Sequence, residues 1–392
     1  MLLHCPACDH REPHDPMAFA CARCGSPLEV GYDPAELERA SHFEGHGVWR
    51  YRPLLPVDRG VTLGEGDTGL HACERLGPEL RVPRLWVKNE GENPTGSFKD
   101  RGMTVGISLA ITVGARVVAC ASTGNTAASM SAYAARAGLK AVVLIPAGQV
   151  ARGKLSQSIA HGAVIAEVNG NFDDAMRLVV ELSSSEKSVY LLNSLNPYRL
   201  EGQKTLAFEV CEALGEAPEA LVLPMGNAGN ISALWKGLKE FHALRKIAKL
   251  PRLIGVQAER AAPIVAALGS GAEMQRVEHP ETIATAIRIG APVNWKKVVA
   301  AIRESQGEAG TVTDEEILAA QHLLAAREGL FVEPASAAPI AYLRKRRLAG
   351  AASVVCVATG HGLKDPEAAS RMPARIDRVE PRLDAIHRLI DR

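Results

Sequence analysis

Residues 91–103 read Gly-Glu-Asn-Pro-Thr-Gly-Ser-Phe-Lys-Asp-Arg-Gly-Met and carry one lysine, Lys99, near their centre. An apolar run, Leu85-Trp-Val-Lys88, precedes this stretch and predicts a β-strand. The Asn, Pro and Gly residues that follow favour a turn, and the small residues as far as Ala110 are compatible with a helix. We therefore expect Lys99 to lie where a loop meets the start of a helix, a place where backbone N–H groups gather anionic ligands.

A lysine amine is a useful nucleophile only when burial or a nearby cation lowers its pKa. We expect Arg101 to supply that charge and Phe98 to supply part of the apolar cover over Lys99. Most loop lysines are exposed and charged, so Lys99 taken alone does not establish any chemistry. Its interpretation depends on the other motifs of the chain.

The composition is that of a globular protein with a sizeable core. The chain has 392 residues, of which 47% are hydrophobic, 23% charged and only 4% aromatic. This length predicts more than one domain, and the shortage of aromatic residues favours closely packed α/β layers over a β-sandwich. The net charge of +1 gives no general attraction for nucleic acids or acidic membranes.

Targeting signals are not evident in the sequence. No apolar run approaches the ~18 residues that a membrane-spanning helix needs. The first residues, Met-Leu-Leu-His-Cys-Pro, lack the basic end and the long apolar core of a signal peptide. We therefore expect a cytoplasmic protein without nucleic-acid or membrane partners.

Four of the eight cysteines form two close pairs, Cys5-x-x-Cys8 and Cys21-x-x-Cys24. Two turns that each present two thiolates can close a tetrahedral site, and in a reducing compartment metal binding explains them better than disulfides do. The spacing predicts a structural zinc ribbon, with rubredoxin-like iron and a metal-free state as alternatives. Because sulfur would fill all four positions, no position at the metal is left for substrate.

From residue 85 onward, continuous apolar runs alternate with helix-type segments. This pattern predicts parallel sheets that are covered by helices on both faces. Thr313-Asp-Glu-Glu316 has the spacing of a capping box and should begin a helix that ends near Arg327. A charged amphipathic helix is expected over Arg375–Arg392. The other predicted elements are the strands Arg116–Ser122, Ala141–Pro146, Ala163–Val168, Ser188–Asn193, Ala220–Met225, Arg252–Gln257 and Ser353–Ala358, and the helices Thr126–Ala137, Phe172–Ser184, Leu200–Ala213 and Ile231–His242.

Two polar loops follow predicted strands and precede predicted helices. In open parallel sheets, ligands bind beyond the carboxyl ends of the strands. Ser122-Thr-Gly-Asn-Thr126 is expected either to hold a carboxylate at the start of its helix or simply to cap that helix through Asn125 or Thr126. Gly226-Asn-Ala-Gly-Asn230 favours a phosphate cradle, because its glycines allow close approach and a helix dipole aims its amides.

A third loop, Thr359-Gly-His-Gly-Leu-Lys364, places the hydroxyl of Thr359 at the end of the last predicted strand. Four features together indicate pyridoxal phosphate as a cofactor: a candidate Schiff-base lysine, a phosphate cradle, a carboxylate-binding loop and a hydroxyl at a strand end. This cofactor needs an amine for its imine, a cradle for its phosphate and a partner for its ring nitrogen.

Six segments resemble, in the expected order, the motif set of the threonine synthases, a family of fold-type II pyridoxal-phosphate enzymes. The similarity extends from about residue 60 to residue 365. The Ile-Arg-Ile-Gly sequence and the two asparagines of the phosphate loop separate this pattern from those of serine and threonine dehydratases and cysteine synthases. The six segments are residues 91–103, 122–126, 226–230, 286–290, Glu333-Pro-Ala-Ser-Ala337 and 359–364.

The resemblance implies an α/β fold of the tryptophan synthase β type. Two doubly wound α/β domains would hold the cofactor between them, and a small zinc ribbon would precede them. The implied domains are the ribbon, residues 1–30, a large cofactor-binding domain, residues 31–98 and 200–392, and a smaller domain, residues 99–199. Related folds usually dimerise, so we expect a homodimer.

The resemblance also implies roles for single residues. Lys99 would form the Schiff base with the cofactor, Asn125 would bond its 3′-oxygen and Thr359 its ring nitrogen, while the backbone of residues 226–230 would hold its phosphate. The cofactor-binding set is thus Lys99, Asn125, Gly226, Asn227, Ala228, Gly229, Asn230 and Thr359. The substrate carboxylate would be bound by Ser122, Thr123 and Thr126.

The substrate of the family is O-phosphohomoserine, and Lys154 and Arg199 match the positions that hold its phosphate. Ser194 and Asn227 would be their hydrogen-bonding companions, and such a combination suits a dianion. Lys99 would remove the α and then a β proton, phosphate would leave from the γ carbon, and water would add at the β carbon to give threonine. Pyridoxal phosphate and a structural Zn²⁺ are therefore the implied cofactors.

Other functions were weighed against this one. A relative with the same fold could act on phosphoserine, as a cysteate synthase does, or on serine or threonine. A nucleic-acid-binding ribbon is disfavoured, because residues 1–30 contain only Arg11, Arg23 and Phe19 as basic and aromatic side chains. Two positions depart from the family pattern: Thr68-Gly69-Leu70 stands where Thr-Pro-Leu is usual, and Ala291 stands where many members have asparagine.

Overall fold

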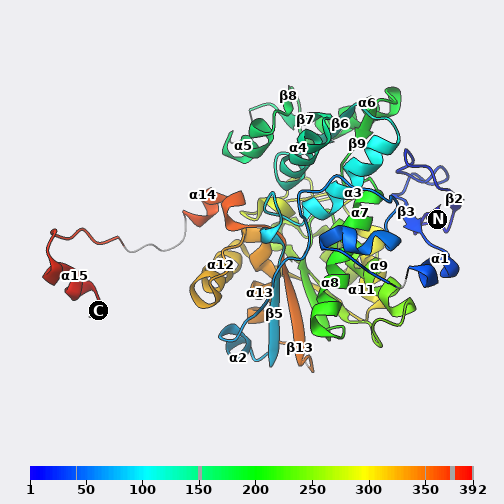
Figure 1. The fold of residues 1–392 in the computed structure, drawn as a ribbon. Coiled ribbons are helices and arrows are strands. Elements are labelled where there is room, and N and C mark those ends of the chain that lie inside the picture. Colours follow the sequence, from blue (N-terminus) through cyan, green and yellow to red (C-terminus); the bar gives the residue numbers. More distant parts are fainter. Residues whose placement is uncertain (41, 149–151, 349, 371–375, 391–392) are drawn as a thin grey trace.

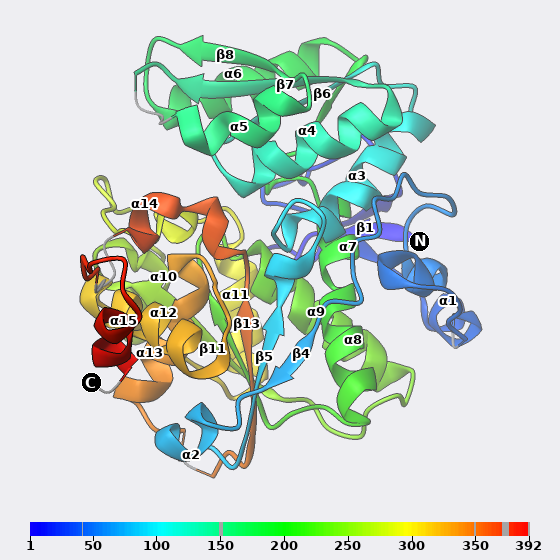
Figure 2. The ribbon, with the colours of Figure 1, turned by 60° about the vertical axis from the view of Figure 1, so that its left-hand side comes forward.

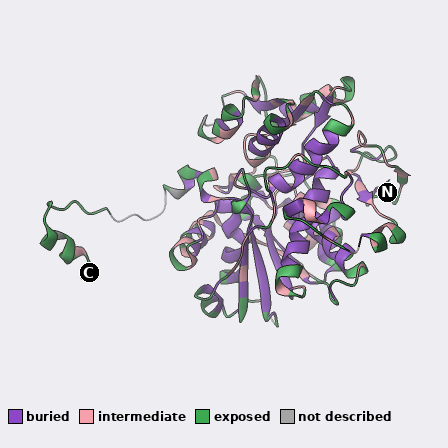
Figure 3. Cartoon of the chain, viewed as in Figure 1, coloured by how far each residue is buried: buried purple, intermediate pink, exposed green. Residues whose placement is uncertain are grey.

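Two large β-sheets form the body of the chain, and a small third sheet lies at the N-terminal end. The computed structural model describes residues 1–392 apart from 41, 149–151, 349, 371–375 and 391–392. As predicted, apolar strands alternate with helices through both large sheets (Figure 1). The central strands of the larger sheet are buried, and exposed residues gather on the surrounding helices and loops (Figure 3). The fold is α/β, as the sequence indicates.

The larger sheet has the strand order β12-β11-β10-β13-β5-β4. It is parallel except for the edge strand β4, which pairs antiparallel with β5. Every residue of β10 and β13 is buried, and this explains why these strands appear in the sequence as continuous apolar runs. The strands are β4 (Leu70–Ala72), β5 (Arg84–Asn89), β10 (Ala220–Pro224), β11 (Arg252–Ala258), β12 (Glu308–Val312) and β13 (Ser353–Ala358).

The smaller sheet is parallel throughout and has the order β8-β7-β6-β9. Its four strands are all among those predicted, and they follow one another within a single stretch of the chain. Helices from the same stretch pack against it, and it lies above the larger sheet in Figure 2. The strands are β6 (Val117–Ala121), β7 (Lys140–Pro146), β8 (Val164–Val168) and β9 (Val189–Leu191).

The predicted helices are confirmed with small shifts at their ends. The capping box at Thr313 forms as expected, since its side chain accepts a hydrogen bond from the N–H of Glu316 and the Glu316 side chain reaches back. The helices are α1 (Pro34–Arg39), α2 (Leu76–Leu80), α3 (Lys99–Thr112), α4 (Asn125–Ala137), α5 (Arg152–Ala160), α6 (Phe172–Ser185), α7 (Tyr198–Gln203), α8 (Thr205–Leu214), α9 (Gly229–Ala243), α10 (Pro263–Ser270), α11 (Trp295–Glu304), α12 (Asp314–Glu328), α13 (Pro334–Lys345), α14 (Pro366–Ala369) and α15 (Leu383–Ile390).

One predicted helix, Leu200–Ala213, is divided into α7 and α8 at Lys204. The backbone of Lys204 keeps helical angles, φ −60° and ψ −24°, so the two helices are nearly continuous. Lys204 is fully buried, and its ammonium group pairs with Glu201 at 2.6 Å and with Glu240 at 2.8 Å. A charge can be buried here because two carboxylates compensate it.

The C-terminal helix is shorter than predicted. It covers Leu383–Ile390, and residues 376–382 are not helical; residues 375, 391 and 392 lie outside the described part of the chain. Pro381 explains the late start, because proline cannot occupy a helix interior without losing a hydrogen bond. Within the described residues, no helix has both the length and the hydrophobicity needed to cross a membrane.

The N-terminal sheet is antiparallel and consists of β1 (Leu2–His4), β2 (Arg11–Pro13) and β3 (Glu29–Gly31), in the order β2-β1-β3. Its apolar residues Leu3, Leu28 and Val30 are buried in the same core as the smaller sheet. It also contacts α11, where the ammonium group of Lys297 donates to the carbonyl oxygen of Leu28 at 2.8 Å. The ribbon, residues 1–30, therefore packs against both large units, beside α7 (Figures 1 and 2).

A buried ion-pair network lies directly behind Lys99. Arg101 is fully buried and makes two paired contacts, with Glu90 at 2.6 and 2.8 Å and with Glu209 at 2.6 and 2.7 Å. Lys88 adds a further ion pair to Glu209 at 2.7 Å. The network joins β5, α3 and α8, so it fixes the start of α3 against the larger sheet.

Gly69, where the family usually has proline, lies beside this network. Its N–H donates to the Oε2 atom of Glu92 at 2.5 Å. Proline has no N–H and could not make this hydrogen bond. Thr68, the residue before it, donates its hydroxyl to Glu90 at 2.7 Å and thus keeps the connection to Arg101. The departure from the family pattern is therefore accommodated locally.

Candidate functional site

Lys99 is the first residue of α3, as the sequence predicts. The loop before it is hydrogen-bonded to the loop after β13: the N–H of Phe98 donates to the carbonyl oxygen of Thr359 at 3.0 Å, and that of His361 donates to Gly96 at 2.9 Å. Two motifs that lie far apart in the sequence, residues 91–103 and 359–364, are therefore side by side at the carboxyl end of the larger sheet.

The amine of Lys99 lies in an environment that favours its neutral form. It makes no hydrogen bond within the described residues, and its Nζ lies 4.2 Å from the centre of the Phe98 ring. Desolvation lowers its pKa most, the charge of Arg199 lowers it further and Glu333 opposes both, with a resulting pKa of about 7. Phe98 supplies the apolar cover as expected.

The prediction that Arg101 provides the neighbouring charge is wrong. Its guanidinium group is fully used by Glu90 and Glu209, and the cation that acts on Lys99 is Arg199. Arg101 stands two positions after Lys99 on α3, so its side chain projects to a different face of the helix.

Asp100 ties the lysine loop to the smaller unit. Its carboxylate accepts hydrogen bonds from the N–H of Thr95 at 2.7 Å, from the Thr95 hydroxyl at 2.6 Å and from the hydroxyl of Ser129 on α4. Burial raises the pKa of Asp100 to about 6, and these hydrogen bonds limit the rise. The start of α3 is thus anchored from two sides, by Asp100 and by Arg101.

Asn125 and Thr359 are brought together by a buried carboxylate. The Nδ2 atom of Asn125 donates to both oxygens of Glu333, at 3.0 and 3.3 Å, and the hydroxyl of Thr359 donates to Glu333 at 3.2 Å. Burial raises the pKa of Glu333, against the hydrogen bond from Asn125. The hydroxyl of Ser336 lies 3.1 Å from that of Thr359. The sequence placed Glu333 and Ser336 in a family motif but did not indicate this contact.

The loop 122–126 connects β6 to α4 and leaves the helix without a side-chain cap. The Ncap residue is Gly124, and neither Asn125 nor Thr126 caps the helix, so the simple capping interpretation is wrong. Ser122 accepts a hydrogen bond from the N–H of Gly124 at 3.3 Å. Thr123 and Thr126 are half-buried and make no side-chain hydrogen bond within the described residues. An uncapped helix start with free hydroxyls suits a carboxylate.

The loop 226–230 connects β10 to α9, and this helix start also lacks a side-chain cap. Ala228 has a left-handed backbone with φ of 60°, a conformation that turns successive N–H groups toward one side. The amide of Asn230 is buried, yet neither its nitrogen nor its oxygen has a partner. Such orphaned polar groups are rare in buried positions, and this amide suits a polar ligand.

The segment 286–290 forms the wall behind this loop. A Cβ atom at Gly226 would lie 3.0 Å from the carbonyl oxygen of Ala286 and 3.2 Å from the Cα of Ile287. A side chain at 226 would press against this backbone, so glycine suits the close approach. The Ile-Arg-Ile-Gly motif therefore supports the loop 226–230 from behind. Ala291, which follows it, is exposed.

Arg199 lies on α7 and is almost fully buried, at 1% exposure. Its Nε and Nη2 atoms have no hydrogen-bond partner. Desolvation lowers its pKa to about 10, which still leaves it charged at neutral pH. A buried cation with unused donors is costly unless an anion compensates it. This side chain is therefore ready to receive an anionic ligand.

Ser194 and Asn227 are joined by Asn294, which the sequence analysis missed. The side-chain amide of Asn294 donates to the carbonyl oxygens of Ser194 and Asn227, in both cases at 3.3 Å. The Oδ1 atom of Asn294 is buried and without a partner. Asn294 carries no motif around it, so only the tertiary structure reveals its position.

Lys154 already has an anionic partner in the structure. Its ammonium group lies 3.1 Å from Asp365 and 3.2 Å from the hydroxyl of Thr285. Beside it, Lys364 donates to Gln157 at 2.7 Å. These contacts connect α5 of the smaller unit with the loop after β13. Lys154 thus lies next to the segment behind Gly226, but Asp365 neutralises its charge.

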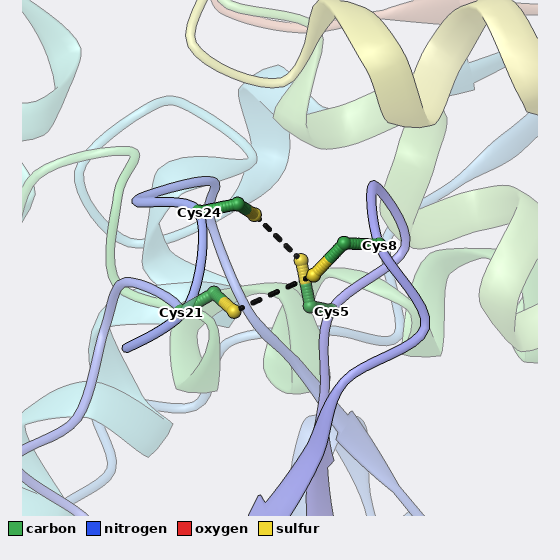
Figure 4. A group of neighbouring side chains, drawn as sticks. All are labelled: Cys5, Cys8, Cys21 and Cys24. Carbon is green, nitrogen blue, oxygen red and sulfur yellow. Dashed lines mark hydrogen bonds between the residues drawn. The ribbon is translucent and has the colours of Figure 1, made fainter.

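The four cysteines of the ribbon converge as predicted. Figure 4 shows their sulfur atoms pointing toward one another, and all four lie within 4.8 Å of one another. Cys5 and Cys24 are 3.5 Å apart, and Cys8 and Cys21 are 3.7 Å apart. A tetrahedral site with metal–sulfur bonds of ~2.3 Å has sulfur–sulfur edges of roughly 3.8 Å. The spacing therefore fits a tetrahedral metal site.

The predicted residues are thus gathered in one region, apart from the ribbon cysteines. The amine of Lys99 is half neutral near pH 7, so it can react with an aldehyde. The two uncapped helix starts can bind anions, and they suit a phosphate group on that aldehyde and a carboxylate on a substrate. The hydroxyl of Thr359 at the strand end adds a further hydrogen-bonding group. The buried guanidinium of Arg199 provides for one more anion.

Comparisons with known proteins agree with this chemistry. The model of the family described as Pyridoxal-phosphate dependent enzyme matches residues 61–360. The threonine synthase of Methanocaldococcus jannaschii is 50% identical over 100% of this chain and 99% of its own length. That of Halalkalibacterium halodurans is 53% identical over 81% of this chain and 89% of its own length.

Among solved structures, the diaminopropionate ammonia lyase of Escherichia coli matches with a TM-score of 0.69 at 16% identity, over 91% of this chain and 95% of that chain. At this identity the match supports the fold alone. The two threonine synthases, however, are 50% and 53% identical to this chain over 81% or more of its length. The chain belongs to the pyridoxal-phosphate dependent enzymes and, within them, to the threonine synthases.

Proposed function

We propose that this chain converts O-phospho-L-homoserine and water to L-threonine and phosphate with pyridoxal phosphate as cofactor. The observation that carries the substrate assignment is Arg199, a buried cation with two unused donor atoms next to the Lys99 amine. A substrate that brings its own phosphate would compensate this charge. Serine or threonine would leave it uncompensated.

The cofactor would be held by residues from three loops. Lys99 would bind it covalently, the uncapped start of α9 with residues 226–230 would hold its phosphate, and Thr359 would bond its ring nitrogen. Asn125, now bonded to Glu333, would turn to the 3′-oxygen. When bound, pyridoxal phosphate withdraws electrons and stabilises negative charge on the substrate carbons. A hydroxyl at the ring nitrogen, rather than a carboxylate, would leave that nitrogen without a full proton.

The substrate would be bound at both ends. Ser122, Thr123 and Thr126 would take its carboxylate at the free start of α4, where the helix dipole favours an anion. Its phosphate would lie on the Arg199 side, with Ser194 and Asn227 nearby. Lys154 would join them by exchanging Asp365 for the phosphate, which carries the greater charge.

Lys99 would carry the protons. Its lowered pKa lets the free amine accept a proton from the α carbon near neutral pH and later one from the β carbon. Phosphate would leave from the γ carbon, and the two abstracted protons would return to the γ and α carbons. The hydroxyl of a water molecule would add at the β carbon, and the remaining proton of that water would leave with the phosphate. The apolar ring of Phe98 keeps bulk water away from this amine.

The test is a paired assay of the holoenzyme with O-phosphohomoserine and with O-phosphoserine. Equal amounts of phosphate and threonine from the first substrate, at a kcat/KM at least about a hundredfold above that for the second, support the proposal. A preference for phosphoserine would instead favour the cysteate-synthase type. Activity on serine or threonine alone would overturn the role of Arg199.

The pKa of Lys99 predicts how the apoenzyme captures its cofactor. The neutral amine is the nucleophile, so the capture rate should rise about tenfold per pH unit below pH 7 and level off above it. The measurement is the growth of the visible imine band after mixing with pyridoxal phosphate between pH 5 and 9. A rate that keeps rising to pH 10, as for an ordinary lysine, would contradict the environment described for Lys99.

We further propose that Cys5, Cys8, Cys21 and Cys24 bind a structural Zn²⁺. The convergence of the four sulfur atoms supports this site. Hydrogen bonds from Ser26 lower the pKa of Cys24 to about 6, which favours the thiolate that a metal needs, whereas burial raises the pKa of Cys5 to about 12. With all four positions filled by sulfur, the metal would have no catalytic role.

Metal analysis tests this site. We expect about one zinc ion per chain, and a value near zero in the double variant C8S/C24S. The variant C73S/C211S is the matched control, because Cys73 and Cys211 are buried elsewhere in the chain. Iron in place of zinc, with the colour of an iron–thiolate site, would favour the rubredoxin-like alternative.

The assembly and the division into domains are proposals as well. We propose a cytoplasmic homodimer whose chains each consist of the ribbon, residues 1–30, a large domain, residues 31–98 and 200–392, and a smaller domain, residues 99–199. The two separate large sheets support this division. Light scattering of the purified chain measures the assembly, and a mass of one chain would contradict it.

A further inference from the structure

The part of the ribbon between its two cysteine pairs, residues 9–20, lies on the segment that carries Arg199. The hydroxyl of Tyr198 donates to the carbonyl oxygen of Asp15 at 2.7 Å, and that of Tyr190 donates to Pro16 at 3.2 Å. The ring of Phe19 meets the ring of Tyr190 edge-on, with centres 5.4 Å apart. Residues 9–20 thus hold both β9 and the first residue of α7.

A second contact holds the other end of the same helix. Tyr32, which follows β3, donates its hydroxyl to the Oε2 atom of Glu201 at 2.9 Å. Glu201 is almost fully buried and also accepts from Lys204 at 2.6 Å. The residues on both sides of Arg199 in α7 are therefore fixed by the N-terminal segment that includes the ribbon.

The helix α7, of 6 residues and without a side-chain cap, packs against α3 and α9 and continues almost directly into α8. Within the described residues, however, the hydroxyl of Tyr198, next to Arg199, is bonded only to the ribbon. Arg199 itself has two atoms without partners, so its guanidinium is not held by hydrogen bonds at those positions. Its stem packs against α3, where a Cβ at Gly106 would lie 3.3 Å from the Arg199 Cγ. The position of the charge thus depends on where the backbone of α7 lies.

A metal at the four cysteines would close residues 9–20 into a loop, because Cys8 and Cys21 flank it directly. Joining the ends of a flexible segment removes much of its conformational freedom. Without the metal, the carbonyl groups of Asp15 and Pro16 would lose their fixed place, and with them the two tyrosines would lose their acceptors. The metal would therefore act on α7 although it lies outside the active site.

We propose that the metal-loaded ribbon positions Arg199, so that the affinity for the substrate phosphate depends on metal occupancy. This inference rests on the proposed function, in which Arg199 binds that phosphate. Tyr198 is then a positioning residue that acts through Arg199. The binding of the cofactor and of ligands without a phosphate should not depend on the ribbon.

The test measures inhibition of the holoenzyme by inorganic phosphate, with L-threonine as a comparison ligand without phosphate. In Y198F the inhibition constant for phosphate should rise about threefold to tenfold, as expected for one lost hydrogen bond, while that for threonine and the visible spectrum stay unchanged. Y342F is the matched control, because the hydroxyl of Tyr342 donates to Glu308 at 3.0 Å, away from the ribbon. It should leave both constants unchanged.

Metal removal provides the second arm. Chelation of the native chain should weaken phosphate inhibition at least as much as Y198F does, and added Zn²⁺ should restore it. R199K should weaken phosphate inhibition further. If R199K weakens it and neither Y198F nor chelation does, the inference is overturned and the proposed function stands. If R199K leaves it unchanged, Arg199 does not bind the phosphate, and both are overturned.

Discussion

The variant K99A is expected to lower kcat for O-phosphohomoserine by a factor of about 10³ or more. Two losses combine in this variant, because the same amine would bind the cofactor and carry the protons. Lys99 suits both tasks: its pKa is about 7, and no hydrogen bond within the described residues competes for its amine. The measurements are kcat and the visible absorption band of the imine, which should disappear from the purified variant.

K364A is the informative comparison for K99A. Lys364 is also a partly buried lysine near Glu333, and burial lowers its pKa. Its ammonium group, however, already donates to the carbonyl oxygen of Thr95 at 2.9 Å and to Gln157 at 2.7 Å. K364A should therefore keep the imine band. If K364A lost the band and K99A kept it, the assignment of the nucleophile would be wrong.

The largest effect on stability is expected from R101M, which should lower the free energy of unfolding by about 3–5 kcal/mol. Methionine fills much of the volume of arginine but leaves Glu90 and Glu209 buried without their partner. The midpoint of urea unfolding, followed by circular dichroism, measures the change. R177M is the control, because Arg177 forms comparable ion pairs on the exposed surface of α6 and should have little effect.

The same network predicts a pH dependence. Burial opposes ionisation of Glu209, but the charges and hydrogen bonds of Arg101 and Lys88 outweigh burial and lower its pKa from 4.5 to about 2. Because the pKa of Glu209 is lower in the folded than in the unfolded state, its ionised form stabilises the fold. This stability is present above pH 4.5 and is lost as the pH falls toward 2. The difference in stability between the parent chain and R101M should therefore shrink across this range. An equal difference at pH 2 and pH 6 would contradict it.

Much of the fold could be predicted from the sequence. Strands such as β10 and β13 are buried along their whole length, so each leaves a continuous apolar run. The strand β12 leaves no such run, because it is an edge strand with a glycine and mostly half-buried residues. The division of one predicted helix at Lys204 also has no local signal in the sequence, and the buried ion pair of Lys204 with Glu240 joins residues 36 positions apart.

The site residues that belong to sequence motifs could be predicted from the sequence. Lys99, Asn125 and Thr359 stand in loops whose glycine and hydroxyl residues mark the ends of strands. The carboxylates that surround them were not assigned roles: Glu333 contacts Asn125, and Asp365 pairs with Lys154. These partners lie more than 200 positions apart in the sequence, |i−j| of 208 and 211, and no local pattern connects them. Arg101 was misjudged for a different reason: it is close to Lys99 in sequence, but α3 directs the two side chains to different faces.

The strand pairing of the larger sheet has a consequence for synthesis on the ribosome. One of its parallel pairs joins β5, made early, to β13, made near the end of the chain. The smaller sheet, by contrast, is complete once residues 117–191 have emerged. The smaller sheet is therefore the first of the two that can fold during translation, while β5 waits unpaired on its β13 side. A nascent chain that is stalled after α8 should already protect β6–β9 from proteolysis, whereas β5 becomes protected only after release.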